Sequence, residues 1–422
     1  MLVREVDATA KGDVMAQHWK TDKWFVSPWN FLPEVMEGWK FPSRMKIHDV
    51  TLRDGEQQAG VVFTKDDKIR IASLLDEAGV HRIEAGMPAV SPADAEAIKV
   101  IAKMGLNAEI FCFSRCMVED VERAAETGVK GVIMEVPASE HIIEHAYKWP
   151  VERAIETTIK ATRYAHKQGL YTVFFPIDAS RAEMTWYLNL IERIATEGHM
   201  DALVLVDTFG VLSPQAVRYF VTRTRERIQK PLETHFHMDF GLGVANTIVA
   251  LMNGAETVHA TVTGLGERAG NVPTEDLVMA LIAMYGVDTG IKLDKLYGLS
   301  QEVRRLANHP IPPNRQIVGD NLFDVESGII TSWYKNTAPD HLTEMFPFLP
   351  EVVGHRPPRM VLGKGSGIDS VAIWLQRIGV KASDEEMQEI LVQVKSASLE
   401  KKALLTEDEF RKIADRVVSP QR

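Results

Sequence analysis

MKIHDVTL (45–52) is the first of eight short, β-rich runs that follow one another along this sequence. Segments with apolar residues at helical spacing separate the runs, as in KDDKIRIASLLDEAG (65–79). Eight strand–helix units in about 240 residues predict an α/β fold, a parallel (β/α)₈ TIM barrel. The later runs are HRIEAGM (81–87), AEIFCFS (108–114), GVIMEVP (131–137), YTVFFPI (171–177), ALVLVDT (202–208), LETHFHMD (232–239) and TVHATVTG (257–264).

A doubly wound open sheet is the alternative for such a pattern. It would need a glycine-rich phosphate turn after its first strand, and RDGEQQAG (53–60) does not fit one. We therefore assign residues 44–285 to the barrel.

The segments on either side of the barrel differ from it in composition. Residues 1–43 hold four of the eight tryptophans, namely Trp19, Trp24, Trp29 and Trp39. Since exposed tryptophans favour association, we expect an arm packed on the barrel or on a partner subunit, in preference to a lid. Residues 286–422 form a mainly helical region, and its last part (383–418) predicts two amphipathic helices. Capping boxes at Ser383–Glu386 and Thr406–Glu409 would start them.

Composition excludes several classes of protein. The 422-residue chain has a net charge of −10, which disfavours nonspecific nucleic-acid binding. It has no apolar run of about 18 residues for a membrane span. The first residues lack the apolar core of a signal peptide. With only two cysteines, Cys112 and Cys116, we expect a cytoplasmic protein.

His235 and His237 are the sharpest local signal for chemistry. Alternate residues of a strand point to one face, so both imidazoles can bind one cation. The alternative is a pair of hydrogen-bonded core histidines. Three acids or amides, Asp54, Asp239 and Asn271, can complete a ligand set, and an acid from another strand end favours metal binding. Asp239 would otherwise accept a hydrogen bond from a histidine N–H group. Imidazole with carboxylate oxygen suits Mn²⁺, Zn²⁺, Co²⁺ or Fe²⁺, and Mg²⁺ if more oxygens join.

Other polar residues also fall at strand ends, where barrel enzymes carry their active sites. Arg53, beside Asp54, would polarise a ketone or neutralise an enolate, or else form a salt bridge. Thr208 and Arg115 would hold a substrate carboxylate, or else act as a strand cap and a surface ion pair. Glu84 and Glu135 lie within apolar strands and need partners, which favours a place in the site over a structural ion pair.

The stretch GLGERAGN (264–271) follows the eighth run and so is not a dinucleotide fingerprint. Its glycines permit close backbone approach and would place Asn271 on the metal. The alternative is a tight strand–helix turn with a surface pair between Glu267 and Arg268.

Three motifs together resemble the DRE-TIM metallolyase superfamily: HDVTLRDGEQQAG (48–60), ETHFHMDFGLGVANT (233–247) and TGLGERAGNVPTEDLV (263–278). This superfamily includes 2-isopropylmalate, homocitrate and citramalate synthases and hydroxymethylglutaryl-CoA lyase. The resemblance implies a (β/α)₈ barrel with a divalent metal held by Asp54, His235 and His237, with Asn271 as a fourth ligand. It also implies that Arg53 stabilises an enolate or polarised carbonyl and that Thr208 binds the carboxylate of a 2-oxo acid.

Within the superfamily, GERAGN and LFDVESGII (322–330) resemble the synthases, whereas the lyase carries a cysteine in its last loop. Three positions depart from the pattern of the synthases. The synthase histidine of the ESG segment is replaced at Val325 or Ile330, the glutamate after the fifth strand by Ile177, and the asparagine of HxHND by Met238.

The sequence therefore predicts a metal-dependent enzyme that condenses a 2-oxo acid with an acyl-CoA, with Arg53 and Glu135 as catalytic residues. The alternatives are a lyase or aldolase that cleaves a hydroxy acid with the same metal, and a non-catalytic barrel that binds 2-oxo acids. The resemblance to the synthases also implies a homodimer or higher oligomer. The substrate, the metal in vivo, the direction of reaction and the base stay open.

Overall fold

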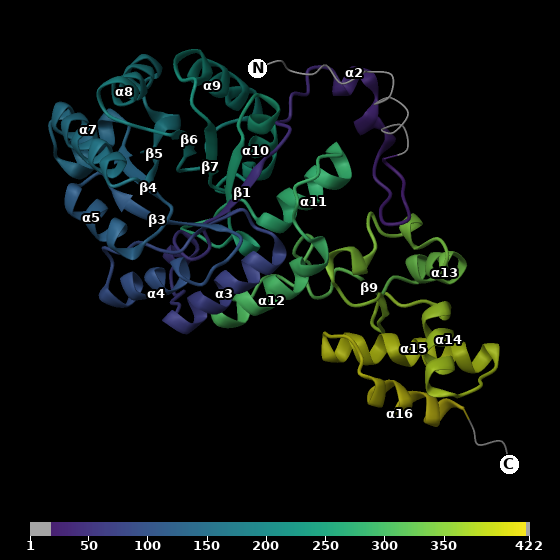
Figure 1. The fold of residues 1–422 in the computed structure, drawn as a ribbon. Helices are drawn as coiled ribbons and strands as arrows, with labels where there is room; N and C mark the ends of the chain where they lie inside the picture. The colour runs from purple at the N-terminus through teal and green to yellow at the C-terminus, as the bar shows by residue number, and fades with distance from the viewer. Residues whose placement is uncertain (1–17, 419–422) are drawn as a thin grey trace. The chain divides into compact units, whose positions relative to one another are not determined.

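The computed structural model describes residues 18–418, and these residues divide into two compact units (Figure 1). One unit is Trp29–Ile311. The other joins residues 18–28 to the chain from Pro312 onward. None of the helices in the described part of the chain combines the length and apolar character that a membrane crossing requires.

The first unit is a closed barrel of eight parallel strands, as predicted. Each strand pairs with the next, and β8 pairs back onto β1 in register, with Lys46 opposite Thr257 and Asp49 opposite Ala260. The strands are β1 (Lys46–Asp49), β2 (Arg82–Glu84), β3 (Glu109–Arg115), β4 (Gly131–Pro137), β5 (Tyr171–Ile177), β6 (Ala202–Asp207), β7 (Leu232–Phe236) and β8 (Thr257–Ala260). All eight predicted runs contain a barrel strand.

Helices surround the barrel (Figure 1), and local sequence explains where several begin. Thr64 forms a capping box with Asp67, and Ser91 and Ser213 cap helices whose first residue is proline. The helices are α3 (Lys65–Ala78), α4 (Pro92–Ala102), α5 (Val118–Thr127), α7 (Val151–Lys167), α8 (Met184–Glu197), α9 (Pro214–Arg227), α10 (Gly243–Met252) and α11 (Thr274–Tyr285).

Shorter elements fill the connections. Between β4 and α7 the chain forms α6 (Glu140–Ile142) and a single π-helical turn, η3 (Ile143–Tyr147). Before β1 lies the four-residue helix α2 (Pro33–Met36). The 3₁₀ turns are η1 (Pro28–Phe31), η2 (Gly55–Gln57), η4 (Ala179–Arg181), η5 (Val262–Gly264), η6 (Leu293–Lys295), η7 (Leu342–Glu344) and η8 (Pro350–Val353).

The barrel unit extends past residue 285, the limit expected from sequence, to Ile311. The reason is α12 (Leu296–Leu306), which packs against α3 and buries Leu296, Leu299 and Val303. Apolar residues at helical spacing do not reveal against which neighbour a helix will pack.

The tryptophan-rich segment is divided between the two units. Trp39 packs on Tyr285 of the barrel, with ring centroids 5.1 Å apart. Trp24 instead forms an antiparallel bridge with Phe348, and the Phe25 amide donates to the Pro347 carbonyl at 3.0 Å. Trp39 therefore packs on the barrel, as expected. Residues 18–28 instead pack with the C-terminal part of the chain. Residues 1–17 lie outside the described residues.

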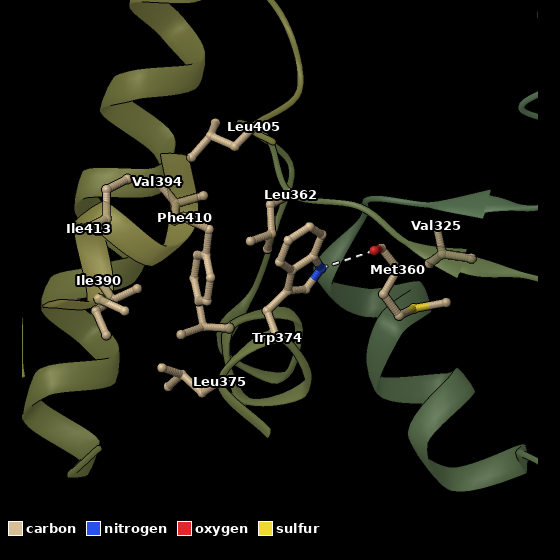
Figure 2. Packing of buried hydrophobic residues seen from close by; sticks show 12 residues of the cluster. Val325, Met360, Leu362, Trp374, Leu375, Ile390, Val394, Leu405, Phe410 and Ile413 are labelled. Atoms are coloured by element: carbon tan, nitrogen blue, oxygen red, sulfur yellow. Dashed lines mark hydrogen bonds between the residues drawn. The ribbon is translucent and has the colours of Figure 1, made fainter. Parts of the chain in front are cut away.

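The C-terminal unit is mainly helical and has its own core (Figure 2). The side chains of Trp374 and Phe410 pack edge to face, and the Trp374 indole donates to the Met360 carbonyl at 3.0 Å. Val325 is buried in this core and Ile330 packs against it. Its elements are β9 (Asp324–Val325), β10 (Arg359–Met360), α13 (Gly328–Thr337), α14 (Ile368–Ile378), α15 (Asp384–Lys401) and α16 (Glu407–Val417). Both predicted capping boxes are present, at the starts of α15 and α16.

Phe410 is fully buried, so Phe410→Ala is expected to lower the free energy of unfolding of this unit by about 3–5 kcal/mol. Hydrogen exchange of the amides of α14–α16 in the full chain measures the change. Leu399→Ala, at a side chain that is 54% exposed, is the matched control. Equal protection in the Phe410→Ala and Leu399→Ala variants would contradict the assignment of this core.

Candidate active site

The candidate metal ligands meet at the carboxyl ends of the barrel strands. Asp54 follows β1, His235 lies in β7, and His237 follows it by two residues. Asp54 Oδ2 lies 3.2 Å from His235 Nε2 and 3.9 Å from His237 Nε2, and the two Nε2 atoms are 3.3 Å apart. All three side chains are buried. The structure thus brings together two imidazoles and one carboxylate from opposite ends of the barrel sequence.

These three groups are held in the protonation states that bind metal. Burial lowers the pKa of His235 to about 3, against the attraction of Asp54. Burial also lowers the pKa of His237. Burial opposes ionisation of Asp54, but Arg53 and His235 hold its pKa well below its usual range. At neutral pH the site therefore presents two neutral imidazoles and one carboxylate.

The donor set fits a divalent cation. Metal–ligand bonds of about 2.1 Å that meet at tetrahedral to octahedral angles place donor atoms about 3.0–3.4 Å apart. The separation of the two Nε2 atoms falls in this range. Asp54 Oδ1 is buried and has no hydrogen-bond partner among the described residues. These residues fit a divalent metal.

Arg53 lies beside this cluster, and its guanidinium group has several partners there. Its Nη1 donates to Asp54 Oδ2 at 2.8 Å, its Nε donates to Glu84, and its guanidinium stacks over Phe113, 4.1 Å from the ring centroid. Although burial opposes its charge, Glu84 and Asp54 raise its pKa. Nη2 is buried and finds no partner within residues 18–418. A buried, fixed cation with a free N–H group can stabilise negative charge on a ligand.

The glycine-rich loop after β8 brings Asn271 to His237, with which it forms a backbone bridge. A side chain at Gly266 would clash with the Asn271 amide, and one at Gly270, whose φ is +84°, would strike the Gly264 carbonyl. Close backbone approach therefore requires these two glycines. The Asn271 amide donates to the Leu265 carbonyl at 3.0 Å and is buried.

Arg268 of the same loop pairs with Asp239. Its Nε and Nη2 lie 2.9 and 3.0 Å from the two Asp239 carboxylate oxygens. Asp239 thus pairs with a cation of the loop, and Glu267, the other candidate partner of Arg268, is 3.7 Å away.

Glu135 enters the barrel mouth from β4 and is buried. The Tyr147 hydroxyl donates to its Oε1 at 3.3 Å. Burial raises the pKa of Glu135 to about 7, although Tyr147, Arg115 and Arg53 favour its charged form. A carboxyl group with a pKa near neutrality is suited to general acid–base catalysis.

Thr208 and Arg115, the two proposed carboxylate binders, both have protein partners. The Thr208 hydroxyl accepts a 2.9 Å hydrogen bond from the Asp178 amide. Arg115 is half exposed, and its Nε and Nη2 donate to the two carboxylate oxygens of Asp120 at 2.6 and 3.2 Å. Arg115 lies opposite Glu135 in the pairing of β3 with β4.

A second histidine cluster lies further down the barrel, where His48, Glu233 and His259 place donor atoms within 4.8 Å. The rings of His48 and His259 stack with centroids 4.4 Å apart and planes 26° apart. Because nitrogen lone pairs lie in the ring plane, two such rings do not converge on one ion. His259 Nε2 lies 2.9 Å from Glu233, which also accepts from Arg82 at 2.6 Å. We interpret this cluster as a buried polar network.

Two features of the site are absent from the sequence analysis. Tyr147 approaches Glu135 through a π turn, for which the sequence gives no signal. Asp178 is fully buried at φ +61° and accepts hydrogen bonds from Ser139 and Arg181 at 2.6 Å each. Asp178 directly follows the fifth run, and this place at a strand end is a signal that could have indicated it.

Known proteins are similar to this chain in sequence and in fold. A family model described as HMGL-like matches residues 44–303. The (R)-citramalate synthase of Methanocaldococcus jannaschii is 41% identical over 352 residues, which cover 83% of this chain and 70% of that protein. The homocitrate synthase of Methanothermobacter thermautotrophicus is 37% identical over 398 residues, which cover 94% of this chain and 99% of that protein.

Among solved structures, the HMG-CoA lyase of Bacillus subtilis superposes with a TM-score of 0.58 at 24% identity. The match covers 64% of this chain and 96% of that one. At this identity the likeness shows a shared barrel fold alone.

Loss of a residue that only hydrogen-bonds to a metal ligand typically lowers metal affinity by roughly 10–100-fold. Because His235→Ala and Asp54→Ala each remove a ligand itself, each is expected to weaken Mn²⁺ binding by more than this. Isothermal titration calorimetry on the full chain measures the affinity. His341→Ala, at an exposed histidine of the C-terminal unit, is the control and should bind as the wild type does. Unchanged affinity in the His235→Ala variant would exclude this ligand set.

Proposed function

This chain belongs to the HMGL-like family, and from that membership and the geometry of the site we propose that it is a metal-dependent acyltransferase. It would form a carbon–carbon bond between a 2-oxo acid and an acyl-CoA. The observation that carries the proposal is the convergence of Asp54, His235 and His237 beside Arg53, whose Nη2 has no partner in the described part of the chain. The relatives are named as synthases of 2-hydroxy acids, the products that such a condensation gives.

A divalent cation held by Asp54, His235 and His237, with Asn271 beside them, would supply Lewis-acid polarisation of the 2-oxo acid. Arg53 is fixed by Asp54 and Glu84, so its Nη2 would donate to oxygen as negative charge develops there, without reorganisation. This places electrostatic stabilisation on a residue that is ordered before substrate binds.

Thr208 would orient the carboxylate of the 2-oxo acid. Its hydroxyl oxygen already accepts from the Asp178 amide, which leaves the hydroxyl proton for a ligand. Arg115, held by Asp120, would contribute positive charge at the same end of the barrel.

Further properties belong to the same proposal. The mixed imidazole and carboxylate ligands suit Mn²⁺, Co²⁺ or Zn²⁺, and Mg²⁺ if water or substrate oxygens complete its shell. Cys112 and Cys116 are unpaired and buried, which agrees with a reducing cytoplasm. Ile329 and Trp333 are large apolar side chains that α13 leaves exposed, which agrees with a homodimer or higher oligomer.

Thiol release from acetyl-CoA tests the activity. We expect release only with a divalent metal and one 2-oxo acid among pyruvate, 2-oxoisovalerate, 2-oxoglutarate and oxaloacetate. Arg53→Lys should lower kcat by about 10²–10³-fold, because a lysine cannot reproduce the forked contacts of the guanidinium. Arg193→Lys is the control, since Arg193 forms ion pairs on the exposed surfaces of α7 and α8.

No thiol release with any of the four acids would contradict the synthase assignment. Metal-dependent release of a 2-oxo acid from a hydroxy acid, without coenzyme A, would support a lyase in its place.

A further inference from the structure

Glu135 is positioned close to the candidate metal site by strand register. Within β4, Ile133 lies in the apolar interior of the barrel, and Glu135 points the same way because alternate residues of a strand share a face. Glu135 lies opposite Phe175 of β5 in the parallel pairing. The Phe175 ring in turn packs against the His235 ring, with centroids 5.0 Å apart. Phe175, on the strand next to Glu135, therefore contacts a candidate metal ligand with its ring.

Tyr147 reaches Glu135 through an irregular segment of backbone. The π turn η3 begins at buried Ile143 and is followed by Lys148, a non-glycine residue with φ +54°. Such turns and left-handed residues cost stability and are frequent at functional sites. The geometry aims the Tyr147 hydroxyl at Glu135 Oε1 from the solvent side, since Tyr147 is 39% exposed and Glu135 is buried.

The surroundings of Glu135 balance its protonated form against its ionised form. Burial disfavours its charge, and Asp120 of α5 adds repulsion. Tyr147 of the π turn, Arg115 of β3 and Arg53, after β1, favour the carboxylate. The balance puts the pKa of Glu135 at about 7, so each form is populated at neutral pH.

We propose that Glu135 is the catalytic base that removes a proton from the α-carbon of the acyl-CoA, and that Tyr147 is a positioning residue that holds its carboxylate. This inference rests on the proposed function and deepens it. The departures at Val325 and Ile330 agree with it, since both residues take part in the apolar core of the C-terminal unit (Figure 2 labels Val325).

The proposed step balances in atoms and charge. Glu135 takes the proton, and the electrons of the broken C–H bond form the new bond to the ketone carbon of the 2-oxo acid. The ketone π electrons move to its oxygen, which takes a proton back from Glu135. Water then adds to the thioester carbonyl and the C–S bond breaks. The water oxygen stays in the new carboxyl group, and one water proton passes to the leaving thiolate to release free coenzyme A.

Two variants separate the two roles. Glu135→Gln is expected to lower kcat by about 10²–10⁴-fold, with Mn²⁺ affinity unchanged. Tyr147→Phe removes a hydrogen bond that favours the carboxylate, so the pKa of Glu135 rises. In a plot of kcat against pH, the rise in kcat should therefore occur at higher pH for this variant than for the wild type. Tyr164→Phe removes a similar bond, from a surface tyrosine to Glu122 at 3.2 Å, and should leave the profile unchanged.

A second measurement does not depend on turnover. A carboxyl group whose folded pKa lies above its unfolded value gives stability at low pH that is lost as pH rises through the interval between the two values. For Glu135 this interval runs from the ordinary value of 4.5 to about 7. The Tm of Glu135→Gln should therefore match the wild type at the acid end and exceed it above pH of about 7.

The outcomes are distinguishable. Wild-type kcat in Glu135→Gln, or an unmoved pH profile in Tyr147→Phe, would overturn this inference and leave the proposed function intact. Equal Tm differences at all pH values would also overturn it. Absence of thiol release from acetyl-CoA with each of the four 2-oxo acids would overturn the proposed function and the role of Glu135 in that reaction. The Tm comparison would then still decide whether Glu135 holds a proton near neutrality.

Discussion

Closure of the barrel between β1 and β8 is the constraint on which the rest of the structure depends. The register of Lys46 with Thr257 and of Asp49 with Ala260 brings the two ends of the barrel sequence together. Without it, Asp54 from the first strand–helix unit would not meet His235 and His237 from the seventh. The site thus exists only in the fully folded barrel. Its geometry is set by backbone hydrogen bonds that involve none of its side chains.

The barrel mouth concentrates buried charge, which costs stability unless each group is paired. Arg53 is the centre of that pairing, because one guanidinium contacts Asp54, Glu84 and the face of Phe113. Below it, His48 Nε2 lies 3.3 Å from Glu84 Oε2 and continues the polar contacts toward His259 and Glu233. Among residues 18–418, one donor of Arg53 and one carboxylate oxygen of Asp54 find no hydrogen-bond partner. A ligand that occupied both would satisfy them, so the incomplete pairing is itself a sign of function.

Strand periodicity was sufficient to predict the eight strands and the shared face of His235 and His237. The approach of Asp54 then follows from topology, because the ends of parallel strands meet at one rim. Tyr147 could not be predicted, since its place depends on a π turn and on Lys148 in a left-handed conformation, and neither has a sequence pattern. The pairing of Arg115 with Asp120, five residues away, depends on how α5 follows β3. The tryptophans of the first 43 residues predicted burial, yet they could not reveal that Trp24 and Trp39 would pack in different units.

The central claim is that Asp54, His235 and His237 bind one divalent cation at the barrel mouth. Anomalous diffraction from crystals of the full chain grown with Mn²⁺ tests it most directly. The account predicts an anomalous peak bonded to both imidazole Nε2 atoms and to the Asp54 carboxylate. A peak confined to His48, Glu233 and His259, or no peak at the barrel mouth with Mn²⁺ in excess, would contradict it.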